Sequence, residues 1–257
     1  VRVLERKLAA ICRKAAMKIV DGEKTVKITE KDLHEYLGAP RYFPERQALE
    51  ERVGVVNGLA WTSVGGELLE VEAGVMEGSG KLELTGNLGD VMKESAQAAL
   101  SCLRTRCGEL GIPADFYKTK DIHIHFPEGA VPKDGHSAGI AITTALCSAL
   151  TGRKIRAKLA MTGEVTLRGR VLPIGGLKEK TMAALRYGVE TVLIPQDNVR
   201  DLEDIDQTVR KALHFIPVRT VDEVLTAALC PREETAEEPA EAAFAPVAEP
   251  VRPALRQ

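Results

Sequence analysis

A serine set between glycines is the residue of this chain best placed to do chemistry. Residues 132–139 read Pro-Lys-Asp-Gly-His-Ser-Ala-Gly, so Ser137 has a glycine two positions away on each side. Glycines let a substrate backbone come close, and the apolar run 140–150 predicts a buried helix directly afterwards. The first N–H groups of a helix have no partner within it, as an oxyanion hole requires. Ser137 is therefore a candidate nucleophile. The candidate loop and oxyanion positions are Gly135, His136 and Ala138.

Other interpretations of this serine remain. Serine often caps the start of a helix, and the same N–H groups can hold a phosphate. Residues 135–139 also match the G-x-S-x-G nucleophile elbow, whose base is a histidine, and only His214 lies downstream. An elbow needs a strand that runs directly into the serine. The strand predicted at 121–126 ends earlier and is followed by Pro127 and Pro132, so we set the elbow aside.

If no histidine serves, the remaining base is a lysine, as in Ser-Lys pairs. An ammonium cannot accept the serine proton, so this lysine must be neutral, and an apolar setting lowers a lysine pKa. The amphipathic helix predicted at 178–187 offers Lys178 and Lys180, and helical spacing places apolar residues beside both. Periodicity does not separate them. A solvated lysine with its stem on apolar surface is the alternative for each.

Three segments follow one another in an informative order. They are Pro132–Gly139, Met161–Gly169 (Met-Thr-Gly-Glu-Val-Thr-Leu-Arg-Gly) and Leu172–Ala184. Together they resemble the proteolytic domain of bacterial Lon, an ATP-dependent serine protease, and the similarity extends over residues 1–229. The resemblance implies that Ser137 is the nucleophile and Lys180 the general base. It also implies that Thr162 supports the pair by hydrogen bonding near Lys180.

Two acids and a histidine nearby are further candidates. A carboxylate beside the lysine would keep it charged, so we interpret Asp134 either as a switch or as a turn former before Gly135. As a switch, it would face the pair in a resting form and turn away in an active one. Glu164 lies close to Thr162 in sequence, and its role is unassigned. The family usually has proline where this chain has His136; proline would stiffen the loop, so histidine predicts a less preorganised loop.

The composition limits the other possibilities. The chain has 257 residues, 44% of them hydrophobic, which suffices for one substantial domain and a smaller one. Its formal charge of −2 gives no electrostatic footprint for nucleic acid. Five cysteines without metal-ligand spacing or a secretion signal predict reduced thiols and a cytoplasmic protein. No apolar run reaches the length of a membrane span. His123 and His125 share a strand face but have no partner at metal-ligand spacing, so we predict no metal site.

The strands and helices point to an α+β fold. The predicted strands are 53–61, 66–75, 81–85 (edge-like), 122–126, 159–161 and 191–194, and the predicted helices are 1–20, 91–106 with Asp90 as its cap, 138–150 and 178–187. These elements alternate without a regular βαβ rhythm, which favours α+β. Trp61, the only tryptophan, we expect in the core. A capping pattern at 29–32 predicts a short helix that ends near Gly38.

The domain organisation follows from these elements and the resemblance. We expect four parts: residues 1–38 as the helical tail of an AAA+ small subdomain, 39–48 as a linker, 49–230 as the Lon-type proteolytic domain, and 231–257 as a disordered Pro/Ala/Glu-rich tail. The chain begins with valine, which indicates a fragment, and it has no G-x-x-x-x-G-K-[ST] phosphate loop. We therefore expect no cofactor in the fragment. ATP and Mg would be bound mainly by the absent AAA+ part, with Arg2 as a nucleotide sensor.

Two functions of different class are weighed. The first is a serine endopeptidase that cuts unfolded or damaged proteins delivered by an attached ATPase ring, which the resemblance implies is a homohexamer. The second is a catalytically silent Lon-like scaffold or peptide-binding domain. The presence of both Ser137 and Lys180 at their motif positions favours the first.

Overall fold

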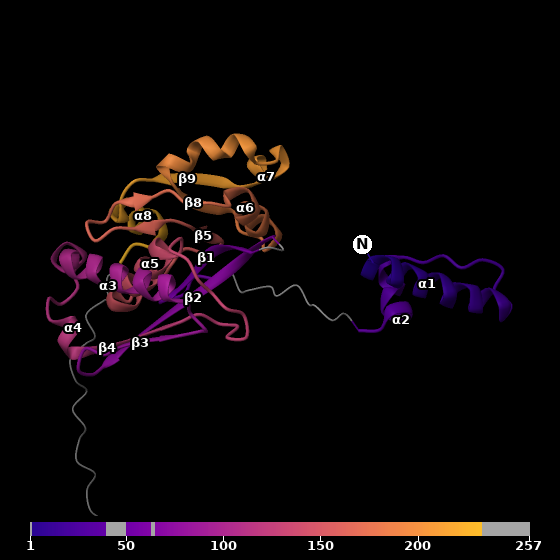
Figure 1. Cartoon of the computed structure of the whole chain (residues 1–257), viewed down its shortest axis with the longest axis horizontal. Helices are drawn as coiled ribbons and strands as arrows, with labels where there is room; N and C mark the ends of the chain where they lie inside the picture. Colours follow the sequence, from indigo (N-terminus) through magenta and orange to yellow (C-terminus); the bar gives the residue numbers. More distant parts are fainter. Residues whose placement is uncertain (1, 40–49, 63–64, 233–257) are drawn as a thin grey trace, which may run out of the picture. The chain divides into compact units, whose positions relative to one another are not determined.

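The computed structural model describes residues 2–39, 50–62 and 65–232. It divides into two compact units, whose boundary falls between residues 48 and 49. Each unit is drawn in Figure 1 and is described here by itself. The predicted linker at 39–48 and the predicted tail at 231–257 lie outside the described residues, apart from Ala39, Pro231 and Arg232.

The first unit is helical, as the sequence predicts. Its elements are α1 (Arg2–Val20), the 3-10 helix η1 (Glu30–Asp32) and α2 (Leu33–Leu37). The N–H and hydroxyl of Thr29 both donate to Asp32 Oδ2, at 2.8 and 2.7 Å, which is the predicted capping. Gly38, with φ +78°, ends α2. The predicted short helix is therefore confirmed at both ends.

The second unit is built on a seven-stranded mixed sheet in the order β3-β4-β2-β1-β5-β8-β9. Its strands are β1 (Val55–Thr62), β2 (Gly65–Glu77), β3 (Leu82–Thr85), β4 (Lys120–His125), β5 (Leu159–Met161), β8 (Thr191–Pro195) and β9 (His214–Val218). Strand β2 is antiparallel to β1 and β4, whereas β1, β5, β8 and β9 pair in parallel. A separate hairpin joins β6 (Glu164–Val165) to β7 (Val171–Leu172).

Helices pack against both faces of this sheet. They are α3 (Asp90–Leu110), α4 (Phe116–Thr119), α5 (Gly139–Thr151), α6 (Leu177–Arg186), η2 (Gln196–Asp204), α7 (Gln207–Ala212) and α8 (Val221–Ala228). Helix α5 contacts α3, α8 and the sheet, while α6 contacts β1, β2, η2 and α7 (Figure 1). Met161 and Leu193 belong to the core under α5, and their neighbours Ala160 and Val192 belong to the core under α6. Strands β5 and β8 are thus buried on both faces, which explains their unbroken apolar sequences.

The α+β prediction is confirmed, and the structure adds elements that the sequence reading missed. The predicted strands and helices all form, and the 81–85 segment is an edge strand, as expected. Hairpin β6–β7, helices α4, α7 and α8, and strand β9 were not predicted. Strand β9 contains Pro217, which normally argues against a strand, but β9 is the other edge, where proline is tolerated. Helix α8 carried a signal: Thr220 accepts from Glu223 N, a capping pattern.

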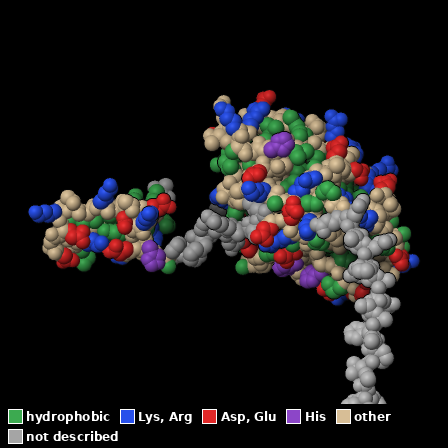
Figure 2. Space-filling model, turned by 180° about the vertical axis from the view of Figure 1, so that it is seen from behind, with side chains coloured by type: hydrophobic (Ala, Val, Ile, Leu, Met, Phe, Trp, Pro, Cys, Tyr) green, Lys and Arg blue, Asp and Glu red, His purple; other side chains and the backbone are tan. Residues whose placement is uncertain are grey.

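The surface carries both signs of charge. On the face seen in Figure 2, acidic and basic side chains are interspersed and form no large patch of one sign. This agrees with the formal charge of −2. Among the helices of the described residues, none is both long and apolar enough to cross a membrane.

Candidate active site

The site forms at the carboxyl ends of the parallel strands. Gly58 of β1 lies opposite Met161 of β5, so Trp61 and Thr162 both come beyond this pairing at the same edge of the sheet. Ligands of open α/β sheets usually bind at this edge, where the strands end and loops begin. Helix α6 crosses β1 and β2 and brings Lys180 over the edge from one side. The loop that leads into α5 brings Ser137 from the other.

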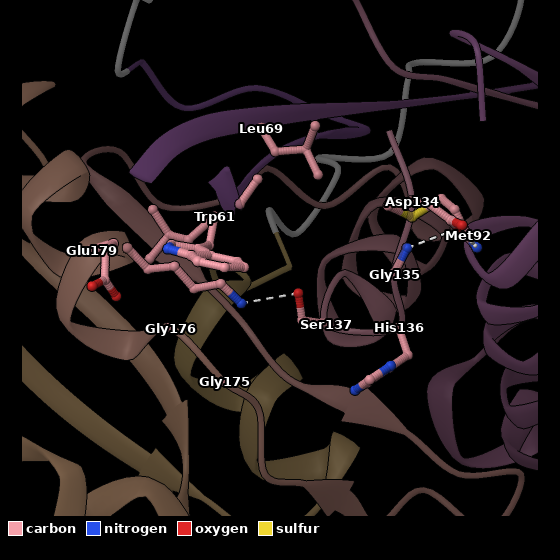
Figure 3. Close-up of a pocket in the computed structure, with 13 residues that line it drawn as sticks. Trp61, Leu69, Met92, Asp134, Gly135, His136, Ser137, Gly175, Gly176 and Glu179 are labelled. Atoms are coloured by element: carbon pink, nitrogen blue, oxygen red, sulfur yellow. Dashed lines mark hydrogen bonds between the residues drawn. The ribbon is translucent and has the colours of Figure 1, made fainter. Parts of the chain in front are cut away.

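Three polar side chains meet there. Lys180 Nζ lies 3.0 Å from Ser137 Oγ and 3.0 Å from Thr162 Oγ1, and the ammonium donates to both oxygens. The hydroxyl of Thr162 in turn donates to the carbonyl oxygen of Ser137 at 3.3 Å. Figure 3 marks the bond between the lysine and Ser137 with a dashed line. Segments far apart in the sequence thus bring together the serine, the lysine and the threonine that the sequence singled out.

Lys180 is buried, and no carboxylate pairs with it among the described residues. It is 3% exposed, and burial lowers its pKa from 10.5 to about 8. The cause is desolvation, because an apolar surrounding disfavours the ammonium relative to the neutral amine. A substantial fraction of this side chain is therefore neutral near physiological pH.

The structure separates the two candidate lysines, which periodicity could not. Lys178 is exposed, whereas Lys180 faces inward on α6 with Leu177 and Ala184, which are both buried. Gly176, the cap residue of α6, has φ +70° and sets the direction in which the helix starts. Of the two, only Lys180 lies at Ser137.

Ser137 is not the cap of α5. The cap position is Ala138, and the Ser137 hydroxyl bonds to the lysine rather than to a helix N–H. Backbone bonds fix the serine instead: Gly163 N donates to Ser137 O at 2.8 Å, and Ile140 N donates to Gly163 O at 3.1 Å. The N–H groups of Ser137 and Ala138 donate no hydrogen bond within the described residues. They are free at the helix start, next to the serine oxygen.

Asp134 is turned away from the lysine in this structure. Its Oδ1 accepts from the N–H of Met92, in the first turn of α3, and from its own neighbour Gly135, both at 2.9 Å. The cap position of α3 is Gly89, so the prediction that Asp90 caps this helix is wrong. The carboxylate that satisfies the helix start comes from a distant loop, a contact that no local pattern reveals. The switch interpretation assigns this outward position to an active form, and the bond from Gly135 N fits the turn former, so both interpretations stay predictions.

His136 and Glu164 lie against each other at the rim. His136 Nε2 is 3.4 Å from Glu164 Oε2, and the two side chains are 55% and 36% exposed. Figure 3 shows the imidazole of His136 below the bond between Ser137 and the lysine, with no dashed line to either residue. The structure thus gives Glu164, which had no assigned role, a partner in the serine's own loop.

A pocket of about 380 Å³ opens at Ser137 and Lys180. Its other lining residues are Leu59, Ala60, Trp61, Leu69, Met92, Asp134, Gly135, His136, Gly175, Gly176 and Glu179. Trp61 is 59% exposed and lines this pocket, so the prediction that it lies in the core is wrong. It is the second-to-last residue of strand β1 and lies beside Gly176, where an added Cβ would meet its side chain at 3.0 Å. Sequence reasoning also missed Leu59, Leu69, Met92 and Glu179, which carry no local signal for a pocket.

The remaining candidates lie elsewhere. His214 is exposed at the start of the edge strand β9 and is not part of the pocket. His123 and His125 both hydrogen-bond to Thr85 Oγ1, at 2.8 and 2.7 Å. No group of three or more possible ligands for a metal ion occurs in the residues that the structure covers. Arg2 is exposed on α1, in the first unit.

Comparisons with known proteins agree with the sequence motifs. Residues 27–231 match the Lon protease (S16) C-terminal proteolytic domain, and residues 1–28 match the Lon protease AAA+ ATPase lid domain. The chain is 57% identical to Lon protease of Brevibacillus choshinensis over 89% of its length, 58% to Lon protease 1 of Bacillus subtilis (89%) and 55% to Lon protease of Escherichia coli (89%). It spans 30% of the length of each of these relatives. The chain therefore belongs to the Lon protease family (S16), as a C-terminal segment that contains the proteolytic domain.

Proposed function

We propose that this chain cleaves peptide bonds with Ser137 as nucleophile and Lys180 as general base. One observation carries the assignment: a buried lysine, whose pKa is lowered to about 8, lies 3.0 Å from a serine hydroxyl at the floor of an open pocket. A neutral amine at this distance can take the serine proton as the oxygen attacks. Membership of the Lon protease family supports the same reaction.

The reaction proceeds in two halves. Ser137 Oγ attacks the carbonyl carbon of the scissile bond while its proton moves to Lys180 Nζ. The negative oxygen that forms is stabilised by the free N–H groups of Ser137 and Ala138 at the start of α5. The ammonium of Lys180 then protonates the leaving amine, the C–N bond breaks, and an ester to Ser137 remains. In the second half, water gives a proton to Lys180 as it attacks the ester carbon. Lys180 then returns this proton to Ser137 Oγ as the C–O bond of the ester breaks and the acid leaves.

Thr162 orients the base in this scheme. Its hydroxyl donates to Ser137 O, so its lone pairs face Lys180 Nζ, 3.0 Å away. The lysine side chain is thereby held toward the serine. Thr162 is 0% exposed, so no water competes for these bonds. We assign it a positioning role.

The wider function extends beyond the described residues. We propose that the substrates are unfolded or damaged proteins delivered by an attached ATPase ring, that the assembly is a homohexamer, and that the protein is cytoplasmic. The matches to a Lon lid domain and to Lon proteases support this proposal, and all five cysteines are free, as in a reducing compartment. ATP and Mg would bind mainly outside this chain, since the only candidate contact here is the exposed Arg2. No step of peptide hydrolysis above uses them.

The test compares single substitutions in cleavage of an unfolded protein and a small fluorogenic peptide. Ser137→Ala and Lys180→Ala should each lower kcat by at least about a thousandfold, because both groups act in one step. The matched control is Lys178→Ala, which removes an exposed lysine two residues from the base and should leave kcat unchanged. Undiminished cleavage by Ser137→Ala or Lys180→Ala would refute the assignment. A chain inactive in wild-type form that still binds unfolded protein would favour the silent scaffold instead.

A further inference from the structure

The segment 132–139, called the nucleophile loop below, is anchored at its two ends to different parts of the fold. At its start, Gly89 N donates to Lys133 O, and Asp134 accepts from α3. At its end, Ser137 O accepts from Gly163 N. Between the anchors lies Gly135, with φ +122° and open space around its Cα. Glycine adopts this conformation at low energetic cost, so the backbone at Gly135 does little to fix the two ends of the loop relative to each other.

The His136–Glu164 pair extends the second anchor outward. A backbone hydrogen bond joins Ser137 to Gly163. His136, which precedes Ser137, contacts Glu164, which follows Gly163, at 3.4 Å. Among the described residues, this is the one ion pair that reaches from the nucleophile loop to another segment. This contact attaches the residue directly after Gly135 to another segment of the fold.

We propose that the His136–Glu164 ion pair positions Ser137 by fixing the end of the nucleophile loop to β6. The proposal rests on the proposed function of Ser137, and it makes His136 and Glu164 positioning residues. Among the described residues, the imidazole makes no hydrogen bond with Ser137 or Lys180, so we assign His136 no part in proton transfer. It acts by limiting the positions that the serine oxygen samples relative to Lys180.

The strength of this link depends on salt, because both side chains are partly exposed. The other charged groups in or beside the loop are Lys133, whose ammonium donates to the carbonyl oxygens of Glu128 and Val131, and Asp134, whose carboxylate is engaged by α3. Glu179 and Lys180 from α6 line the same pocket. The link is therefore strongest at low salt.

Hydrogen–deuterium exchange tests the link without relying on catalysis. At low salt, peptides that cover 133–139 should exchange faster in His136→Ala and in Glu164→Gln than in wild type. The double variant should exchange no faster than either single variant, because both remove the same contact. The matched control is Glu83→Gln on the edge strand β3. It removes a carboxylate that lies 3.9 Å from His123 of β4, and it should not change exchange in the nucleophile loop.

Kinetics with a fluorogenic peptide test the positioning. Each single variant should lower kcat about two- to fivefold with KM unchanged, the range expected for a partly exposed pair. The deficit should shrink in high salt, which weakens the attraction in wild type as well. A lost packing contact would not respond to salt. In His136→Lys, which keeps a basic side chain at this position, slow exchange should persist at low salt.

The outcomes separate the two proposals. Unchanged exchange in both single variants would overturn the link. Faster exchange with unchanged kcat would overturn the positioning role. If Ser137→Ala still cleaved peptide, the proposed function would fail, while the exchange data would still decide whether the pair holds the loop.

Discussion

At the scale of single residues, burial distinguishes a base from an ordinary lysine. Lys178 and Lys180 occupy the same helix and have similar apolar neighbours in sequence, but only Lys180 is buried. Desolvation lowers its pKa to about 8, and no carboxylate within the described part of the chain pairs with it. The outward position of Asp134 contributes to this, because a carboxylate at the lysine would raise the pKa again.

The pH dependence of cleavage follows from this pKa. The active form is the neutral amine, so kcat/KM should rise with pH and level off above about 8. Between pH 7 and 8 the neutral fraction, and with it the rate, should increase by about fivefold. A pH–rate profile with a small ester or peptide substrate measures this. A rate that is flat between pH 6 and 9 would exclude Lys180 as the titrating base.

Exposed aromatic surface also has a place at the residue scale. Trp61 stands open to solvent at the pocket, although large apolar side chains normally lie in the core. Together with Leu59, Leu69 and Met92 it gives the pocket an apolar wall. Such a wall suits an apolar side chain of a bound peptide.

At the scale of elements, close contact between α5 and β6 locates the serine. Gly139 begins α5, and a Cβ added there would lie 2.7 Å from Val165 N. Only glycine permits this approach, which also allows the Ile140–Gly163 and Gly163–Ser137 backbone bonds to form. The glycine after the serine thus serves helix packing as well as substrate access.

Replacing this glycine should damage both stability and activity. Gly139→Ala should lower the free energy of unfolding by about 1–3 kcal/mol, because the added methyl group forces α5 and β6 apart. Ser137 should move with α5, so kcat should fall as well. Gly108→Ala is the control: it lies within α3 with open space around it and should stabilise the protein by about 0.5–1 kcal/mol. Denaturant unfolding of both variants measures the difference; equal stability would contradict the packing argument.

At the scale of the whole molecule, the described core of the second unit closes just before residue 231. Leu229 is 1% exposed, Cys230 N donates to Lys154 O at 2.9 Å, and Arg153 Nε donates to Cys230 O at 2.9 Å. These contacts tie the end of α8 to the segment after α5. Leu229 and Cys230 are therefore part of the folded second unit.

Two truncations probe this boundary. Removing residues 233–257 should leave peptide cleavage and the free energy of unfolding unchanged. Removing residues 229–257 should cost about 2–5 kcal/mol, the range for loss of a buried leucine, and more through the lost backbone bonds. Thermal unfolding and peptide cleavage of both forms are the measurements. Loss of activity on removal of residues 233–257 alone would show that this segment takes part in catalysis.

The sequence by itself determined the nature of this protein. Three motifs identified the family by resemblance, and the spacing of apolar residues predicted the main strands and helices. The capping pattern at 29–32 predicted a short helix that ends near Gly38. These features depend on neighbours within one or two turns of the chain, so local physics suffices to read them. Segments were missed where they were short, as in the β6–β7 hairpin, or at a sheet edge, as in β9, and helix α8 was missed although it carries a capping pattern.

Only the tertiary structure decided which lysine is buried, where Asp134 points, and that Trp61 is open to solvent. Each of these depends on segments distant in sequence: α6 laid across β1, a loop aspartate at the start of α3, and a strand end beside Gly176. Helical periodicity shows which residues share a face of a helix, but it does not show which face another element covers. The contact between His136 and Glu164 was equally invisible, because the nucleophile loop and β6 meet only in the folded chain.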